Sequence, residues 1–174
     1  MVKIFKKNNI HELKLYNNIL FLSRNKLFYT KCGLTDTFQN RIHLIFIHAS
    51  FLMAKINQDK SNQTYKEFSQ KFFDLIFAQI ELNMREIGFG DVVVNKNMKY
   101  LVKIFYDILI NCKNFKKKTL KRKNIFFSKH LKLNTDQKNL NNMHLIRYFD
   151  RYQAFCVDLS SDNVLKGNLK FNYK

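Results

Sequence analysis

The chain has 174 residues, of which 46% are hydrophobic and 18 are phenylalanines, so it carries enough apolar side chains for the core of one ordinary domain. Proline is absent and there are only four glycines, which disfavours turn-rich β architectures and leaves helices as the default. The three cysteines are widely separated and odd in number, so neither a disulfide framework nor a zinc knuckle is suggested and a reducing compartment fits best.

The formal net charge of +18 is concentrated in two parts of the chain. Residues 1–31 carry +6 and residues 96–132 carry +11, whereas residues 32–95 are close to neutral at −1. Such basic segments attract RNA or anionic lipid headgroups, although a solvated helix end has the same composition. The candidate patch for RNA or an anionic membrane consists of Lys116, Lys117, Lys118, Lys121, Arg122 and Lys123.

Hydrophobic spacing predicts an all-α fold, a single compact bundle of about five to six helices. A first helix is expected over residues 12–24. The polar run from Thr35 to Thr37 supplies oxygen acceptors for a helix N-terminus, so a second helix should begin near Phe38. Residues 41–56 are apolar at nearly every position, and this helix should therefore be surrounded by the others.

A third helix is predicted over residues 64–87, and Gly88 stands where a left-handed C′ residue would end it. Residues 92–94 are expected to form a short extended link at most. The side of this helix opposite its apolar arc is expected to face water or a partner, and it carries Glu67, Asp74, Glu81 and Arg85.

Two more amphipathic helices are expected, over residues 95–115 and 136–159, and no helix is assigned to the basic run between them. Phe126 and Phe127 could stack on bases, but in a chain so rich in phenylalanine we assign them to the core.

The chain is expected to have three parts: a basic N-terminal segment (1–11), a helical domain (12–160) and a loose C-terminal tail (161–174). Residues 1–14 lack the apolar stretch of a secretion signal and the Arg/Ser richness of a mitochondrial transit segment. The apolar stretch 42–53 is too short to span a bilayer. A cytoplasmic protein is expected, with peripheral contact at the inner face of a membrane.

Residues with catalytic chemistry do not form a recognised pattern. Motifs for nucleotides, for nucleophilic serine and for zinc are absent from the sequence. His48 lies in the most apolar helix and is interpreted as a core histidine bonded to a backbone or carboxylate partner. Asp74 and Glu81 would lie about 10 Å apart along a helix, too far for an acid/base pair. No catalytic residue, metal or cofactor is expected.

Several ordered sequence blocks resemble one family. They are Phe28-Tyr29, Gly33-Leu34-Thr35-Asp36-Thr37, Asn40-Arg41, His48, Phe73-Asp74 and Asn83-Met84-Arg85-Glu86-Ile87-Gly88-Phe89-Gly90-Asp91. In this order and spacing they are similar to the ubiquinol-cytochrome c chaperone family over about residues 15–105. Thr35 stands where the family has proline, and Asn40 stands where it has glycine.

The resemblance implies an α-helical, non-catalytic assembly factor for ubiquinol-cytochrome c reductase. Mitochondrial members bind newly made cytochrome b near the ribosomal tunnel exit, together with a small partner protein. Cytochrome b or another reductase subunit is thus the expected partner, with ribosomal RNA or anionic membrane near the basic flanks. The residues assigned to client or partner binding are Asp36, Thr37, Arg41, Asp74, Glu81, Arg85, Glu86 and Asp91.

Two other functions stay open from the sequence. One is a stand-alone RNA-binding helical domain that uses residues 96–132, in which the acidic face would be incidental. The other, with less support, is a helical-bundle metal oxidase.

Overall fold

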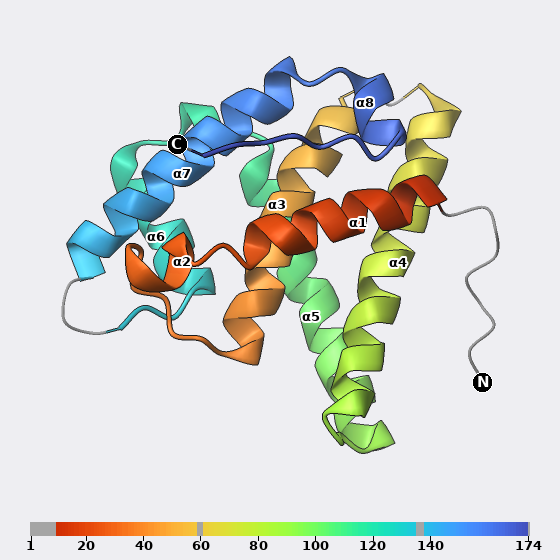
Figure 1. Ribbon diagram of the computed structural model, residues 1–174, viewed down its shortest axis with the longest axis horizontal. Helices are drawn as coiled ribbons and strands as arrows, with labels where there is room; N and C mark the ends of the chain where they lie inside the picture. The colour runs from red at the N-terminus through yellow and green to blue at the C-terminus, as the bar shows by residue number, and fades with distance from the viewer. Residues whose placement is uncertain (1–9, 59–60, 135–137, 174) are drawn as a thin grey trace.

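A computed structural model describes residues 10–58, 61–134 and 138–173 and confirms an all-α fold (Figure 1). The predicted basic segment lies outside the described residues except for its last two positions. Among the described residues, the only β pairing is an isolated bridge between Leu34 and Leu133. The helices are α1 (Ile10–Ser23), α2 (Leu27–Thr30), α3 (Phe38–Ile56), α4 (Gln63–Glu86), α5 (Asp91–Cys112), η1 (Phe115–Lys117), α6 (Leu120–His130), α7 (Lys138–Asp158) and α8 (Ser161–Leu165).

Helix α3 lies at the centre of the molecule. Thr37 begins it as predicted, because its side-chain oxygen accepts a hydrogen bond from the backbone N–H of Asn40 at 3.2 Å. Fourteen of its 19 residues are buried, on all sides of the helix. Helices α1, α4, α5, α7 and α8 all pack against it, with α1 crossing in front and α5 behind in Figure 1. The expectation of a surrounded helix is confirmed.

His48 is fully buried in α3, in agreement with the interpretation as a core histidine. Its Nδ1–H donates to the carbonyl oxygen of Leu44 at 2.7 Å, and its Nε2 accepts from the hydroxyl of Tyr148 at 2.9 Å. The rings of Tyr152 and Phe149 pack edge-on around it at 4.8 and 5.1 Å between centroids. Burial lowers the pKa of His48 to about 4, so a neutral imidazole joins α3 to α7.

Helices α4 and α5 form a long hairpin that projects beyond the other elements at the bottom of Figure 1. Gly88 has a φ of 96°, the left-handed conformation expected for it. The extended link predicted for residues 92–94 is wrong, because α5 already begins at Asp91. An acidic residue in the first turn favours the helix dipole, and burial of Val94 rewards the helical conformation.

Helix α6 was not predicted, because the lysines of its first turns obscure its apolar side. Its N-terminus is capped by Thr119, whose side chain accepts from the backbone N–H of Arg122. Phe126, Phe127 and His130 lie on one side and are buried, at helical spacing. The assignment of the two phenylalanines to the core is confirmed.

The loose tail expected after residue 160 is ordered, and this expectation is corrected. Helix α8 is capped by Ser160 and contacts α1 and α3. At Gly167 (φ 66°) a Cβ would meet the His11 carbonyl oxygen at 2.5 Å, so only glycine allows the chain to approach α1 this closely. The rings of Phe171 and Tyr173 then pack on Tyr148 at 5.6 and 4.9 Å.

Within the described residues, none of the helices has both the length and the hydropathy needed to cross a bilayer.

Stability should depend on pH through His48. In the unfolded chain its imidazole takes up a proton below the ordinary pKa of 6.5, whereas the folded protein keeps it neutral down to about 4. Its contribution is complete above pH 6.5 and is lost as the pH falls toward 4, by about 2 kcal/mol between pH 7 and 5. Burial also lowers the pKa of His130 to about 4, so urea unfolding followed by circular dichroism at the two pH values measures the His48 share only by comparison with a variant that lacks its imidazole.

The His48→Gln variant is the control, because glutamine can still accept a hydrogen bond from Tyr148 but does not titrate. The unfolding free energies of the two proteins should differ less at pH 5 than at pH 7, again by about 2 kcal/mol. Parallel pH profiles for the two proteins would contradict the assignment.

Candidate functional site

The loop that leads into α3 is fixed by a buried amide. The Asn40 side chain donates to the carbonyl oxygens of Thr35 and Lys132 at 2.7 and 2.8 Å, and its oxygen accepts from the Lys132 N–H at 2.9 Å. The Thr35 N–H also donates to the Lys132 carbonyl at 3.1 Å. Thr35 and Asn40, which both depart from the family pattern, thus jointly hold the loop against the segment after α6.

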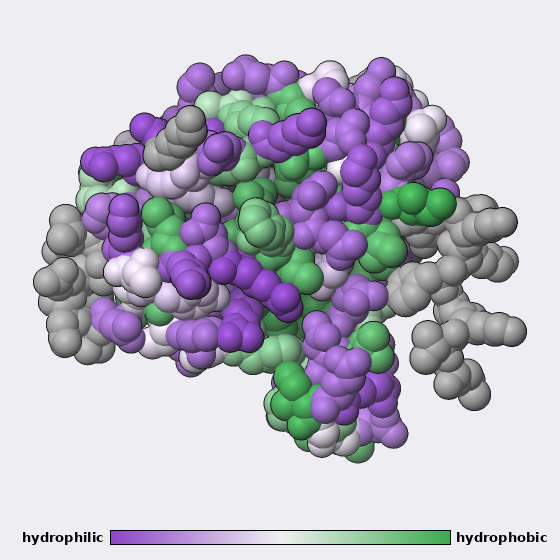
Figure 2. Space-filling view, in the orientation of Figure 1, coloured by the Kyte–Doolittle hydropathy of each residue, from purple (hydrophilic) through white to green (hydrophobic). Residues whose placement is uncertain are grey.

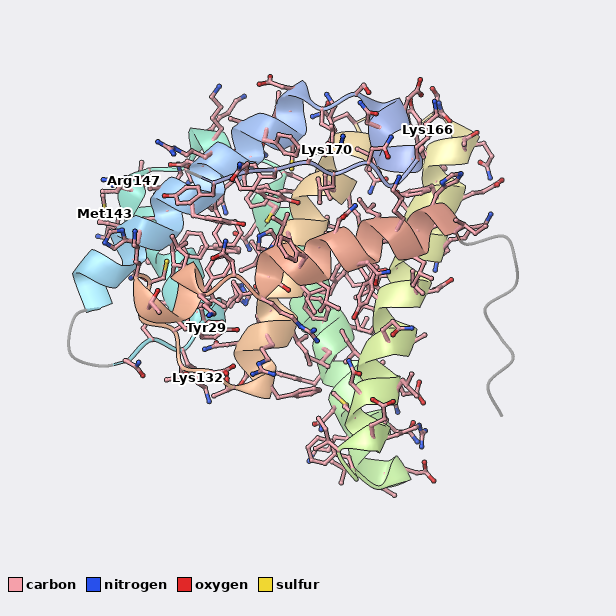
Figure 3. The ribbon with its side chains drawn as sticks, in the orientation of Figure 1. Tyr29, Lys132, Met143, Arg147, Lys166 and Lys170 are labelled. Atoms are coloured by element: carbon pink, nitrogen blue, oxygen red, sulfur yellow. The ribbon has the colours of Figure 1, made fainter. Side chains whose placement is uncertain are left out.

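Asp36 and Arg41 form a two-point ion pair on the outside of this loop. The guanidinium Nε and Nη2 atoms each lie 2.7 Å from one carboxylate oxygen. Both hydrogen bonds lower the pKa of Asp36, while burial and the nearby Asp36 carboxylate raise the pKa of Tyr29. In Figure 3, Tyr29 and Lys132 lie beside the start of α3. The loop therefore presents a charged, preformed surface.

A second charged group closes the end of α4. Arg85 donates through Nε and Nη2 to Glu81 at 3.1 and 2.9 Å, and through Nη1 to Asp91 at the start of α5. These contacts cross the turn at Gly88 and join the two helices of the hairpin. All three side chains remain partly exposed to water, and Glu86 is exposed beside them.

Two hollows lie on either side of the first turn of α3. The first, of about 220 Å³, lies between α1, α3 and α4. The second, of about 240 Å³, lies between α3, α4 and α5. Phe38 and Ile42 line both of them. Arg24, Arg41 and Glu86 line the first hollow, so the loop and the end of α4 meet there. The second hollow is also lined by Gln39, Met84, Phe89, Asn97, Tyr100 and Leu101.

Apolar side chains are exposed around these hollows. Figure 2 shows hydrophobic residues gathered at the projecting end of the hairpin. Val92 is 82% exposed and Ile87 is 60% exposed. Exposure of neighbouring apolar side chains to water is unfavourable and is typical of a surface that binds a partner. We call this region the hairpin-end surface; it comprises the two hollows with Ile87, Phe89, Val92, Val93 and Tyr100.

The structure brings together most of the residues assigned to client binding from the sequence. Arg41, with Asp36 bound to it, and Glu86 lie at the first hollow, and Arg85 connects Glu81 and Asp91 nearby. Two of the assigned residues do not contribute a free side chain to this group. The Thr37 side chain caps α3, while Asp74 accepts a hydrogen bond from Gln70 about 16 Å along α4 from Arg85.

The apolar part of the site was missed. Ile87 and Phe89 flank the glycine that ends α4, and hydrophobic residues at a turn are a signal for exposure that the sequence did contain. For Phe38 and Tyr100 the sequence offered no comparable signal.

The six residues of the candidate basic patch differ in their contacts and exposure. Lys118 donates to Asn111 at 2.5 Å, and Lys123 is buried, with its Nζ 2.5 Å from Asp150 and 5.0 Å from the centre of the Phe115 ring. The four other members of the candidate patch are exposed: Lys116, Lys117, Lys121 and Arg122. In the described part of the chain, no three His, Cys, Asp or Glu side chains gather as a metal site would require.

The comparisons with known proteins bear on the family and on the fold. A family model described as ubiquinol-cytochrome C chaperone matches residues 30–171. The chain belongs to this family. A search of curated protein sequences finds no match. The fold is similar to the crystal structure of the Cbp3 homolog from Brucella abortus, with a TM-score of 0.80, 19% identity, and coverage of 95% of this chain and 91% of the other.

This member of the ubiquinol-cytochrome C chaperone family is a helical bundle with a projecting hairpin (Figure 1). The match spans the loop at Asp36, the hairpin and the segment through Phe171. It therefore covers every residue of the hairpin-end surface except Leu20, Ser23 and Arg24, which line the first hollow from α1 and the residue that follows it.

Lys123 and Lys121 provide a matched pair for a stability test, two residues apart on α6. Lys123→Ala should lower the free energy of unfolding by about 1–3 kcal/mol, because it leaves Asp150 without its partner and removes a buried stem. Lys121→Ala should change it by less than about 0.5 kcal/mol. Urea denaturation of both variants measures the difference, and equal effects would show that Lys123 is not a buried anchor.

Proposed function

We propose that this chain is a non-catalytic assembly factor that binds newly made cytochrome b, or another subunit of ubiquinol-cytochrome c reductase, through the hairpin-end surface. Family membership supports the chaperone role. The observation that carries the proposed site is the pair of hollows on both sides of Phe38 and Ile42, beside exposed apolar residues.

The hairpin-end surface has the composition of a protein-binding site. Interfaces bury a small apolar centre within a polar rim, and a few side chains that fill pockets carry most of the affinity. Here the hollows and the exposed Ile87 and Phe89 would form the centre, and Arg41, Arg85 and Glu86 the rim. A membrane subunit that has not yet been assembled exposes apolar side chains that would fill such hollows.

The charged rim would determine the orientation of the client. Asp36 fixes Arg41, and Glu81 and Asp91 fix Arg85, so these side chains lose little freedom on binding. Fixed charges discriminate between partners more than they add affinity. A small helical partner protein could share this rim with the client. We place the protein in the cytoplasm, in peripheral contact with the inner face of the membrane.

Polar substitutions at the hairpin end should abolish client capture. Ile87→Asp with Phe89→Asp should lower the amount of cytochrome b that copurifies with the tagged chain at least tenfold, as expected when about 2 kcal/mol of contact is lost. Reductase assembly in cells that depend on the variant should fall in parallel. Both side chains are exposed, so the fold should be retained.

The control for this pair is Val157→Asp, an exposed apolar residue on α7 that lies outside both hollows. It should capture cytochrome b as the unmodified chain does. Normal capture by the hairpin-end variant, or an equal loss in the control, would overturn the assigned site.

Substitutions at two exposed carboxylates on α4 test whether the binding site is confined to the hairpin end. Glu86→Lys, at the first hollow, should weaken client capture about three- to tenfold, because it reverses a charge in the rim. Asp74→Lys, about 18 Å away along α4, should leave capture unchanged. Equal losses in both variants would extend the site along the whole polar face of α4.

A further inference from the structure

The side of α5 that faces away from the bundle is basic and partly apolar. Helix α5 packs on α3 and α4 through residues such as Leu101, Phe105 and Ile108, which are buried. Ile110 lies opposite this buried side and is 66% exposed. The exposed lysines of the same outward side are Lys96, Lys99 and Lys103.

Helix α6 continues this surface. Leu120 is 53% exposed and Ile125 is 58% exposed, and Lys121 and Arg122 lie exposed between them. The Nζ of Lys129 lies 2.7 Å from Asp107, one turn before Ile110, so the outward sides of α5 and α6 adjoin. A groove of about 360 Å³ runs there, lined by Asn111, Lys118, Arg122, Ile125, Phe126 and Lys129. We call this surface the α5–α6 face.

The α5–α6 face has almost no negative charge. Residues 96–132 contain twelve Lys and Arg and a single carboxylate, Asp107. Lys129 neutralises this carboxylate at 2.7 Å, and His130 lies 3.0 Å from the same oxygen. The remaining exposed cations thus act on a partner without local compensation, and the partner must be anionic.

We propose that the α5–α6 face binds an anionic lipid bilayer, with Ile110, Leu120 and Ile125 inserted at the level of the headgroups and the surrounding lysines and arginines bound to them. Aliphatic side chains between cations are the composition of an interfacial membrane surface. Tyr106, which is 49% exposed on the same helix, suits the same depth.

The exposed side chains favour lipid over RNA. Single-stranded RNA is held by cations together with aromatic rings on which bases stack. The phenylalanines of this region, Phe115, Phe126 and Phe127, are all buried, and the Tyr106 ring packs against Phe73 at 5.8 Å. Isoleucine and leucine offer RNA no stacking surface, but they gain free energy when they leave water for acyl chains.

One consequence of this membrane placement rests on the proposed function. The outward side of α5 would lie on the bilayer, while the start of the same helix lines the second hollow through Asn97, Tyr100 and Leu101. A client segment emerging from the membrane would then meet the hairpin-end surface directly.

Vesicle sedimentation tests the lipid partner with the full chain. We expect binding to phosphatidylcholine vesicles that contain about 30% phosphatidylglycerol, and little binding to phosphatidylcholine alone. Changing Lys103, Lys121 and Arg122 to Gln should weaken binding about fivefold for each cation removed. Ile110→Ala with Ile125→Ala should weaken it at least tenfold, because about six buried carbon atoms are lost.

The controls lie on other surfaces. Figure 3 shows Lys166 and Lys170 near α8 and the C-terminal segment, on the side turned to the viewer, whereas α5 passes behind α3 and α6 lies behind α2. Lys166→Gln with Lys170→Gln, and Val157→Ala, should therefore bind vesicles as the unmodified chain does. Unchanged circular dichroism spectra would exclude loss of the fold in the test variants.

Three results would overturn the proposal. Equal losses in test and control variants would show attraction by net charge alone, and so would full binding by the isoleucine variant. Tighter binding to single-stranded RNA than to anionic vesicles at about 0.15 M salt would replace the lipid by RNA. None of these results alters client capture by the hairpin-end surface, which the Ile87 and Phe89 substitutions test separately.

Discussion

The structure depends on one constraint, which is that α3 has no polar side. A helix that is apolar all round must be kept from water over its whole circumference, and here five other helices do so. Apart from the partly exposed Ala54 and Lys55 near its end, it escapes complete coverage at its first turn, because α1, α4 and α5 diverge around Phe38 and Ile42 and leave a hollow on each side. The candidate site is thus the place where the packing of the central helix is incomplete.

Most of the buried polar side chains are neutral, and some of them connect elements distant in sequence. Asn40 uses both its donor and its acceptor on the segment after α6, and His48 links α3 to α7 through Tyr148. Hydrogen bonds of this kind offset most of the free-energy cost of removing the polar group from water. They also leave few alternative ways in which the bonded elements can pack against each other. Lys123 and Glu12 are the charged residues among them, and the Lys123 amine has a carboxylate, Asp150, beside it. These contacts fix the loop at Asp36 and the position of α6.

Local signals in the sequence predicted much of the fold. The oxygen of Thr37 and the left-handed Gly88 act within a few residues, so the start of α3 and the end of α4 were correct. Helix α6 was missed because lysines outnumber the apolar residues in its first half. The tail was misjudged because its order comes from tertiary contacts, with α1 at the other end of the sequence and with the aromatic side chains of α7. Exposure of Tyr100 is likewise tertiary, and the turn position of Ile87 and Phe89 was not interpreted as exposure, so the charged rim of the site was predicted and its apolar centre was not.

The uneven distribution of charge along the sequence corresponds to two different surfaces of the structure, which share helix α5. The nearly neutral residues 32–95 build the central helix and the hairpin end, where a strongly charged surface would oppose burial of an apolar client. The strongly basic residues 96–132 begin within α5 and continue through α6, on the outward side of the bundle. Because one rigid helix carries both the lining of the second hollow and the first lysines of the α5–α6 face, the two surfaces keep a fixed relation. A partner bound to either surface therefore determines the direction in which the other faces.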